Sequence, residues 1–75
     1  MILVDVYVPA VNKTYEFKLE DSLYISDIIE EMSDLFAPQE EIDLLLFDAV
    51  SQKALSYSST LRECGVDSGS YLILV

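Results

Sequence analysis

The residue types that most often perform chemistry in proteins are scarce in this chain of 75 residues. It has no histidine, and its one cysteine, Cys64, has no second thiol with which to form a disulfide. A catalytic nucleophile needs a base beside it, and a zinc site needs several histidine or cysteine ligands. A glycine-rich phosphate loop is also missing. We therefore expect a protein that is not an enzyme and that binds no metal and no cofactor.

The cysteine is expected to be a small core residue rather than a redox sensor. Only Arg62 stands near Cys64 in the sequence to favour a thiolate, and unpaired cysteines commonly behave as small buried hydrophobes. Gly65 follows it and suits a backbone position with positive φ, which glycine adopts freely. A single thiol also fits a reducing compartment, so we expect the protein to be cytoplasmic.

Carboxylates are the one abundant reactive group. Fourteen acidic residues against four basic ones give a formal net charge of -10. Such a surface repels nucleic acid and anionic membranes, so protein partners are expected instead. Four acids spaced i, i+3, i+4 and i+7 share one stripe of a predicted helix: Asp27, Glu30, Glu31 and Asp34.

This acidic stripe has two interpretations. It is either a solvated surface or a docking face for a basic partner, continued by Glu40, Glu41 and Asp43. Calcium requires a loop that wraps six or more oxygens around the ion, and the spacing matches no such loop. The solvated surface is the leading interpretation. The argument for a docking role is that the like charges cost the helix about 0.2 to 0.5 kcal/mol for each close pair, although solubility at this net charge does not need them.

Hydrophobic periodicity predicts the elements that carry these residues. Residues 2–8 alternate as a strand with Ile2, Val4, Val6 and Val8 on the core side, and "TYEFKL" at 14–19 alternates as its hairpin partner, with Tyr15, Phe17 and Leu19 inside. A helix follows, with Asp21 and Ser22 as N-terminal acceptors and Pro38 as its stop. Its apolar face is Ile25, Ile28, Ile29, Met32, Leu35 and Phe36.

The second half reads as three further strands. "IDLLLFD" at 42–48 is a short apolar run, "QKAL" at 52–55 is a short partner for it, and "YLILV" at 71–75 ends the chain. The order is strand, strand, helix, strand, short strand, strand, which predicts one α+β domain over residues 1–75 with a single helix across a mixed sheet. The N-terminus lacks the basic region of a secretory signal, and no run is long enough to cross a membrane.

Two stretches carry a resemblance to a known family. "LRECGVDSGSYLILV" at 61–75 is similar to the Leu-x-x-Cys-Gly-Val/Ile-x-x-Gly segment of the YukD/EsaB-type ubiquitin-like proteins of bacterial type VII secretion. The helix entry "DSLYISDIIE" at 21–30 is similar to that family's as well. The resemblance implies a ubiquitin-like β-grasp, in which a mixed sheet of four to five strands packs on one helix and the first and last strands lie parallel at its centre.

The same resemblance implies a function. Proteins of this type are non-catalytic, cytosolic accessory or regulatory components of the secretion machine, and their domain also occurs fused to a membrane component. Conjugation in the manner of ubiquitin needs a flexible tail that ends in Gly-Gly, whereas this sequence ends at Val75 within a strand. Two alternatives stay open: a conjugated or sulfur-carrier protein whose tail follows Val75, and a ubiquitin-like domain cut from a larger membrane component.

The β-grasp register also predicts a docking surface. Leu72 and Leu74 would point under the helix, while the other apolar side chains would meet on the open face of the sheet: Leu3, Tyr7, Leu44, Leu46, Ile73 and Val75. Exposed apolar surface of this size usually marks an interface, here with secretion-machine components or with a second copy of the chain. The alternative is that Tyr7, Lys18 and Lys53 fold over this face and cover it.

Overall fold

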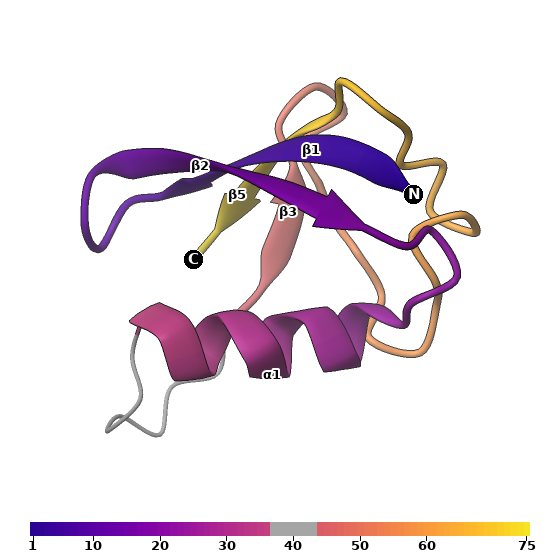
Figure 1. Cartoon of the computed structure of the whole chain (residues 1–75), viewed down its shortest axis with the longest axis horizontal. Coiled ribbons are helices and arrows are strands. Elements are labelled where there is room, and N and C mark those ends of the chain that lie inside the picture. Colours follow the sequence, from indigo (N-terminus) through magenta and orange to yellow (C-terminus); the bar gives the residue numbers. More distant parts are fainter. Residues whose placement is uncertain (37–43) are drawn as a thin grey trace.

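Five strands and one helix form two layers in the described parts of the chain, residues 1–36 and 44–75 of a computed structural model. The helix α1, Ile25–Phe36, crosses one face of the sheet, and the other face has no helix over it (Figure 1). The strands are β1 Ile2–Val8, β2 Lys13–Leu19, β3 Leu46–Asp48, β4 Lys53–Ala54 and β5 Tyr71–Leu74. This is the order of elements that the periodicity predicts.

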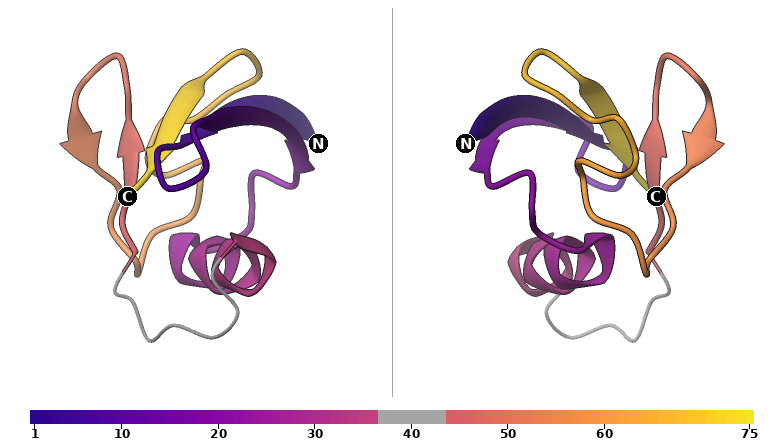
Figure 2. Two further views of the ribbon diagram at one scale, coloured as in Figure 1. Left: turned by 90° about the vertical axis from the view of Figure 1, so that its left-hand side faces the viewer. Right: turned by 90° about the vertical axis from the view of Figure 1, so that its right-hand side faces the viewer.

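The sheet has the strand order β2-β1-β5-β3-β4. The first and last strands lie side by side and parallel at its centre, with Val6 opposite Leu72, and β1 forms an antiparallel hairpin with β2 (Figure 2). The short strands β3 and β4 pair antiparallel at the other side. A mixed five-stranded sheet of this order on a single helix is the ubiquitin-like β-grasp, so the expected fold class is confirmed.

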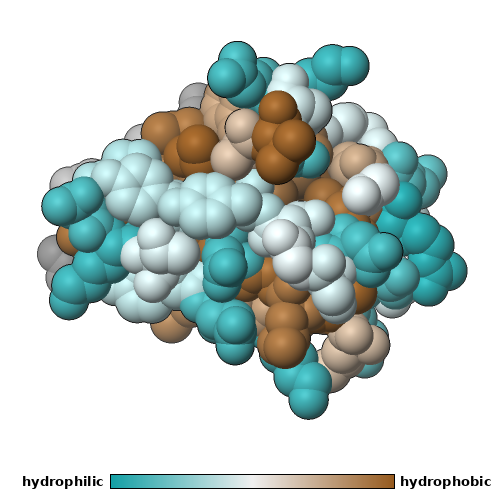
Figure 3. All heavy atoms as spheres, turned by 90° about the horizontal axis from the view of Figure 1, so that it is seen from above, coloured by the Kyte–Doolittle hydropathy of each residue, from teal (hydrophilic) through white to brown (hydrophobic). Residues whose placement is uncertain are grey.

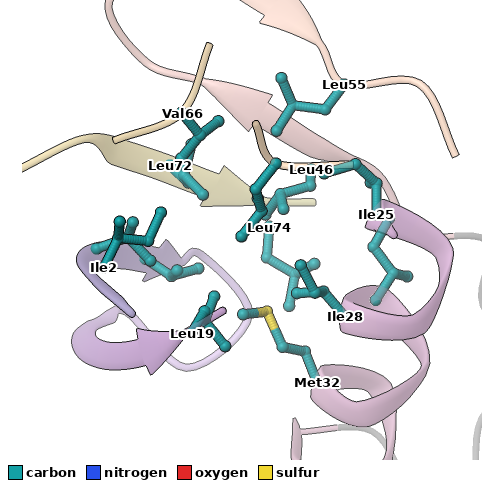
Figure 4. Packing of buried hydrophobic residues seen from close by; sticks show 14 of the residues in the cluster. Ile2, Leu19, Ile25, Ile28, Met32, Leu46, Leu55, Val66, Leu72 and Leu74 are labelled. Atoms are coloured by element: carbon teal, nitrogen blue, oxygen red, sulfur yellow. The ribbon is translucent and has the colours of Figure 1, made fainter. Parts of the chain in front are cut away.

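The helix and the sheet bury one apolar core between them. Ile25, Ile28 and Met32 of α1 point toward Leu46 of β3 and Leu72 and Leu74 of β5, and each of these six side chains is at most 2% exposed (Figure 4). Cys64 is half-buried and packs against this core, in agreement with its expected role.

The predicted apolar face of the helix is wrong at one residue, because Leu35 is 65% exposed. The buried stripe is formed by Ile25, Ile28, Ile29 and Met32. At about 100° per residue, Leu35 lies farther from the centre of this stripe than any other residue of the predicted apolar face. The side chain of Phe36 and the expected stop at Pro38 lie outside the described part of the chain.

The start of α1 is capped by backbone rather than by the predicted side chains. The N–H of Ile25 donates to the carbonyl of Ser59 at 2.9 Å, and the N–H of Ser26 donates to the carbonyl of Tyr57 at 3.2 Å. The loop after β4 therefore satisfies donors that the first helical turn cannot pair internally. Asp21 and Ser22 precede the first helical residue by more than one position, and the Asp21 carboxylate binds Arg62 instead.

The prediction that Leu44 and Leu46 lie on the open face is wrong. Leu46 is opposite Leu74, and Phe47 is opposite Ile73. Side chains of opposed residues point to the same face of a sheet, so Leu46 joins Leu74 in the core, where it is fully buried. Leu44, two residues earlier, also packs against the core, and a shift of one residue in register accounts for both errors.

The corrected register predicts that two adjacent leucines differ in their contribution to stability. Leu46→Ala should lower the free energy of unfolding by about 2–5 kcal/mol, because it leaves a cavity in the core. Leu45→Ala, at a position where the native side chain is 37% exposed, should cost much less. Urea unfolding followed by circular dichroism measures both, and equal losses would contradict the register.

Candidate docking surface

The open face of the sheet, opposite α1, presents a band of aromatic and aliphatic side chains. Strand pairing places Tyr7 of β1, Ile73 of β5 and Phe47 of β3 side by side in one row, which ends at Ala54 of β4. Tyr7, Ile73 and Phe47 are each half-buried, because their neighbours in the row cover part of each side chain. The structure thus brings Tyr7 and Ile73 together as predicted.

A second pair of apolar residues extends the band. Leu45 and Val75 face each other across two backbone hydrogen bonds, of 2.6 Å from Leu45 N–H to Val75 C=O and 2.9 Å in the reverse direction. Their side chains are 37% and 49% exposed. Leu3 is 46% exposed and lies opposite Lys18, nearer the start of β1. The open face is defined from here on as Leu3, Tyr7, Leu45, Phe47, Tyr71, Ile73 and Val75.

Leu45, Phe47 and Tyr71 are the members that sequence reasoning missed. The run "LLLF" at 44–47 is apolar at every position, so alternation could not tell its two faces apart. Tyr71 pairs with Asp5, which pairs with Glu16, so it belongs to a more polar row of the same face. Only the pairing of β3 with β5 gives the signal that separates Phe47 from Leu46.

The tyrosines on this face are held by their hydroxyl groups. The hydroxyl of Tyr7 donates to Oδ1 of Asn12 at 2.8 Å, and the hydroxyls of Tyr71 and Thr14 lie 3.3 Å apart. Asn12 has φ of 52°, a left-handed conformation that asparagine tolerates better than most residues, in the turn between β1 and β2. Both rings are therefore tied toward the β2 side of the face.

The face is not sealed by the predicted cover. Lys53 pairs with Asp48, which pairs with the buried Leu72, so Lys53 belongs to the helix side of the sheet. Val75 stays half exposed and Ile73 is only partly covered. From this side the surface shows several brown apolar areas separated by pale and teal residues, so the band is interrupted rather than continuous (Figure 3).

The acidic stripe lies on α1, on the opposite side of the molecule from the open face. Asp27, Glu30, Glu31 and Asp34 are all exposed. Within residues 1–36 and 44–75, no three histidine, cysteine or acidic side chains are placed to hold one metal ion. The predicted continuation of the stripe through Glu40, Glu41 and Asp43 lies outside the described residues.

A shallow hollow of about 290 Å³ borders this stripe. Glu30 and Asp34 line it together with two serines of α1, and Ile29, Leu44 and Tyr57 supply its apolar and aromatic walls. The hydroxyl of Tyr57 donates to the carbonyl of Leu44 at 2.6 Å and holds that wall in place. The hollow therefore combines carboxylates with apolar and aromatic walls.

The segment that carries the sequence resemblance forms a compact turn. The backbone N–H of Thr60 donates to Oε1 of Glu63 at 2.9 Å, and the backbone N–H of Glu63 donates to Oγ1 of Thr60 at 3.1 Å, which is a reciprocal capping box. Gly65 ends the turn with φ of 76°, as predicted, and Val66 N–H donates to the carbonyl of Leu61 at 3.0 Å. Glycine permits this left-handed closure at little cost.

The same segment is tied to both neighbouring elements. Arg62 makes a two-pronged contact with Asp21, with Nε at 3.1 Å from Oδ2 and Nη2 at 2.9 Å from Oδ1. Further along, Gly69 N–H donates to the carbonyl of Leu3 at 2.9 Å, and Leu3 N–H donates to Oγ of Ser68 at 3.3 Å. These contacts align β5 with β1 and so set which side chains of β5 reach the open face.

Comparison with known proteins identifies the fold alone. No family model and no curated protein matches the sequence. The N-terminal ubiquitin-like domain of the 4931431F19Rik protein superimposes with a TM-score of 0.80 at 23% identity, over 99% of this chain and 72% of that one. ATBAG1, solved in a crystal complex with HSP70, superimposes with a TM-score of 0.78 at 17% identity over 100% of this chain, which spans 40% of ATBAG1.

In the described part of the chain, the helix α1 is neither long enough nor apolar enough to span a bilayer.

The Arg62–Asp21 contact predicts that the stability of the fold depends on pH in the acidic range. The Arg62 hydrogen bond, more than its charge, lowers the pKa of Asp21 below 3.8. A lowered folded-state pKa stabilises the fold above the unfolded pKa, and this contribution is lost as the pH falls through the folded value. Arg62→Gln should return the pKa of Asp21 toward 3.8, as followed by carboxyl-carbon NMR. Lys53→Gln is the matched control and should leave that pKa unchanged.

Proposed function

We propose that this chain is a non-catalytic, ubiquitin-like protein-interaction module that binds a partner protein on the open face of its sheet. The observation that carries the proposal is the row Tyr7, Ile73 and Phe47 with the exposed pair Leu45 and Val75 beside it. Among residues 1–36 and 44–75 the helix covers the other face of the sheet, so a partner protein on the open face would add burial to these side chains. Partly exposed aromatic and aliphatic side chains that gather on one face are suited to contact with a partner protein.

The composition of the open face suits a protein partner. Two tyrosines and a phenylalanine lie among aliphatic residues, and aromatic side chains are enriched in the cores of protein interfaces. Asp5, Glu16 and Lys18 lie at the same face nearer β2 and supply a charged rim. Because hydrogen bonds already hold the tyrosine rings, less side-chain freedom is lost when a partner covers them.

We further propose a cytoplasmic role as an accessory or regulatory component of a bacterial type VII secretion system. Support comes from the resemblance of residues 61–75 and 21–30 to YukD/EsaB-type proteins. These two stretches meet in space, because Arg62 binds Asp21 and the Leu61 N–H donates to the carbonyl of Leu23 at 3.1 Å. A shared pattern at two contacting segments is more informative than either segment alone.

The hollow beside the acidic stripe favours a second docking face on α1. Glu30 and Asp34 would pair with basic side chains, while Ile29 and Leu44 would contact apolar ones. A basic, amphipathic segment of a secretion component has this chemistry. The two faces lie on opposite sides of the molecule, so both can be occupied at once.

Two alternative functions differ in what is encoded beyond this sequence. A conjugated or sulfur-carrier protein would continue past Val75 into a flexible tail ending in Gly-Gly, while a domain of a larger membrane component would continue into apolar helices. Both structural neighbours are parts of longer chains, of which this chain covers 72% and 40%. The intact reading frame distinguishes the three functions directly.

The leading proposal predicts that charge on the open face abolishes partner binding without unfolding. Leu3→Glu combined with Val75→Glu places carboxylates at positions that are 46% and 49% exposed in the native chain. Binding to the purified cytosolic domains of the secretion ATPase and of the membrane component, measured by calorimetry, should be lost. The circular dichroism spectrum should not change.

Val50→Glu makes the same chemical change at an 86% exposed position in the turn between β3 and β4, and it should bind as the native chain does. Undiminished binding by the Leu3→Glu, Val75→Glu variant would rule out the open face as the docking surface. Binding of neither purified component to the native chain would instead count against the secretion role.

A further inference from the structure

The two edges of the sheet differ greatly in length. The edge strand β4 has two residues, Lys53–Ala54, whereas the edge strand β2 has seven, Lys13–Leu19. The strand β2 contains no proline and pairs with β1 at every position, without a bulge. A long regular edge presents unpaired backbone groups to any strand that approaches it, and natural proteins usually shorten, bend or cover such an edge.

The register identifies the backbone groups that this edge exposes. Asp5 N–H donates to the carbonyl of Ser70, and the carbonyl of Leu3 accepts from Gly69, so the odd-numbered residues of β1 turn their backbone groups toward β5. The even-numbered residues of β1 therefore form the backbone hydrogen bonds to β2. Their partners are the odd-numbered residues of β2, whose backbone groups are thus already paired. Thr14, Glu16 and Lys18 are left with N–H and C=O groups directed away from the sheet.

No described element covers this edge. The backbone groups of Thr14, Glu16 and Lys18 accept or donate no hydrogen bond to another element among residues 1–36 and 44–75. In the views of Figures 1 and 2, β2 lies at the outer side of the sheet and α1 lies beneath the sheet rather than alongside β2. The backbone N–H and C=O groups of these three alternate residues are therefore available to a partner strand.

We propose that two copies of this chain dimerise by antiparallel pairing of β2 with β2 about a two-fold axis at Phe17. With residue 17 opposite its own copy, Glu16 of each chain lies opposite Lys18 of the other, and both pairs are of the hydrogen-bonded kind. Each pair joins opposite charges on the same face. The half-buried Tyr15 and Phe17, on the helix side, would also lose part of their exposure.

Neighbouring registers lack this complementarity. An axis at Glu16 would set the two Glu16 carboxylates against each other, and an axis at Lys18 would do the same for the two ammonium groups. Like charges directly opposite one another destabilise a strand pair. The charge sequence of β2 therefore selects one symmetric register.

The overall charge of the chain does not prevent this contact. The chain carries -10, yet β2 carries +1, from Lys13 and Lys18 against Glu16. The acidic stripe lies on the outward side of α1, beyond the layer of the core. At about 0.15 M salt the screening length is about 8 Å, so the stripes of two copies interact weakly across an edge-to-edge dimer. The edge β2 is thus a surface through which two such acidic chains can approach.

The test exchanges the two charges. Sedimentation velocity of the native chain at about 0.15 M salt should show a dimer of twice 8.5 kDa at high concentration. Glu16→Lys alone and Lys18→Glu alone each set like charges across both central pairs, so each should raise the dimer dissociation constant by about tenfold or more. An equimolar mixture of these two variants should form a heterodimer, and the Glu16→Lys, Lys18→Glu double variant should dimerise again.

Lys53→Glu is the matched control, because it changes the net charge as Lys18→Glu does but lies on the other edge, and its dimer should persist. Circular dichroism verifies that every variant is folded. A native chain that stays monomeric at millimolar concentration would overturn the proposal, and so would a dimer that none of the charge variants weakens. The binding tests of the open face do not depend on either result.

Discussion

The parallel pairing of β1 with β5 is the constraint on which the rest of the molecule depends. Both strands have a neighbour on each side, so neither forms an edge of the sheet. Their even-numbered residues fill the core between the sheet and α1. Val6 and Leu72 are opposed and fully buried. Because side chains alternate along a strand, fixing this one pair also fixes Tyr7 and Ile73 on the opposite face. The core and the candidate docking surface are set by the same register.

Polar contacts in the loops maintain that register. The turn at 60–65 closes on itself through Thr60, Glu63 and Gly65, and the segment at 67–70 bonds the backbone of β1 at Leu3 and Asp5. The loop at 56–60 supplies carbonyls to the first turn of α1. A domain of 75 residues buries a smaller share of its surface than a larger protein does, so such backbone contacts compensate in part for a smaller core.

The fold could be predicted from the sequence where the pattern has a single solution. In residues 2–8 and 14–19 the charged side chains fall on only one of the two alternating faces, so alternation assigns inside and outside correctly there. Gly65 has the positive φ that its place in a turn predicts. The run at 44–47 is apolar in both phases, so its register depends on β5, a strand that lies more than twenty residues away in the chain. The open face was therefore predicted in its centre, at Tyr7 and Ile73, and wrongly at Leu44 and Leu46. The carbonyls of Ser59 and Tyr57 that cap the helix belong to a distant loop, so the residues around the helix start could not predict them.

The distribution of charge separates the surfaces of the molecule by chemistry. All four charged residues of α1 are acidic, whereas two of the four basic residues of the chain lie on β2. The helix side therefore repels other acidic surfaces, including those of its own copies, so an acidic partner meets less repulsion at the sheet. The apolar band lies on the open face of the sheet and the outward backbone groups of β2 lie at its edge, so the first offers side-chain contacts and the second offers hydrogen bonds. Glu16 and Lys18 belong both to the charged rim of the open face and to the proposed strand contact, so the two surfaces adjoin along β2.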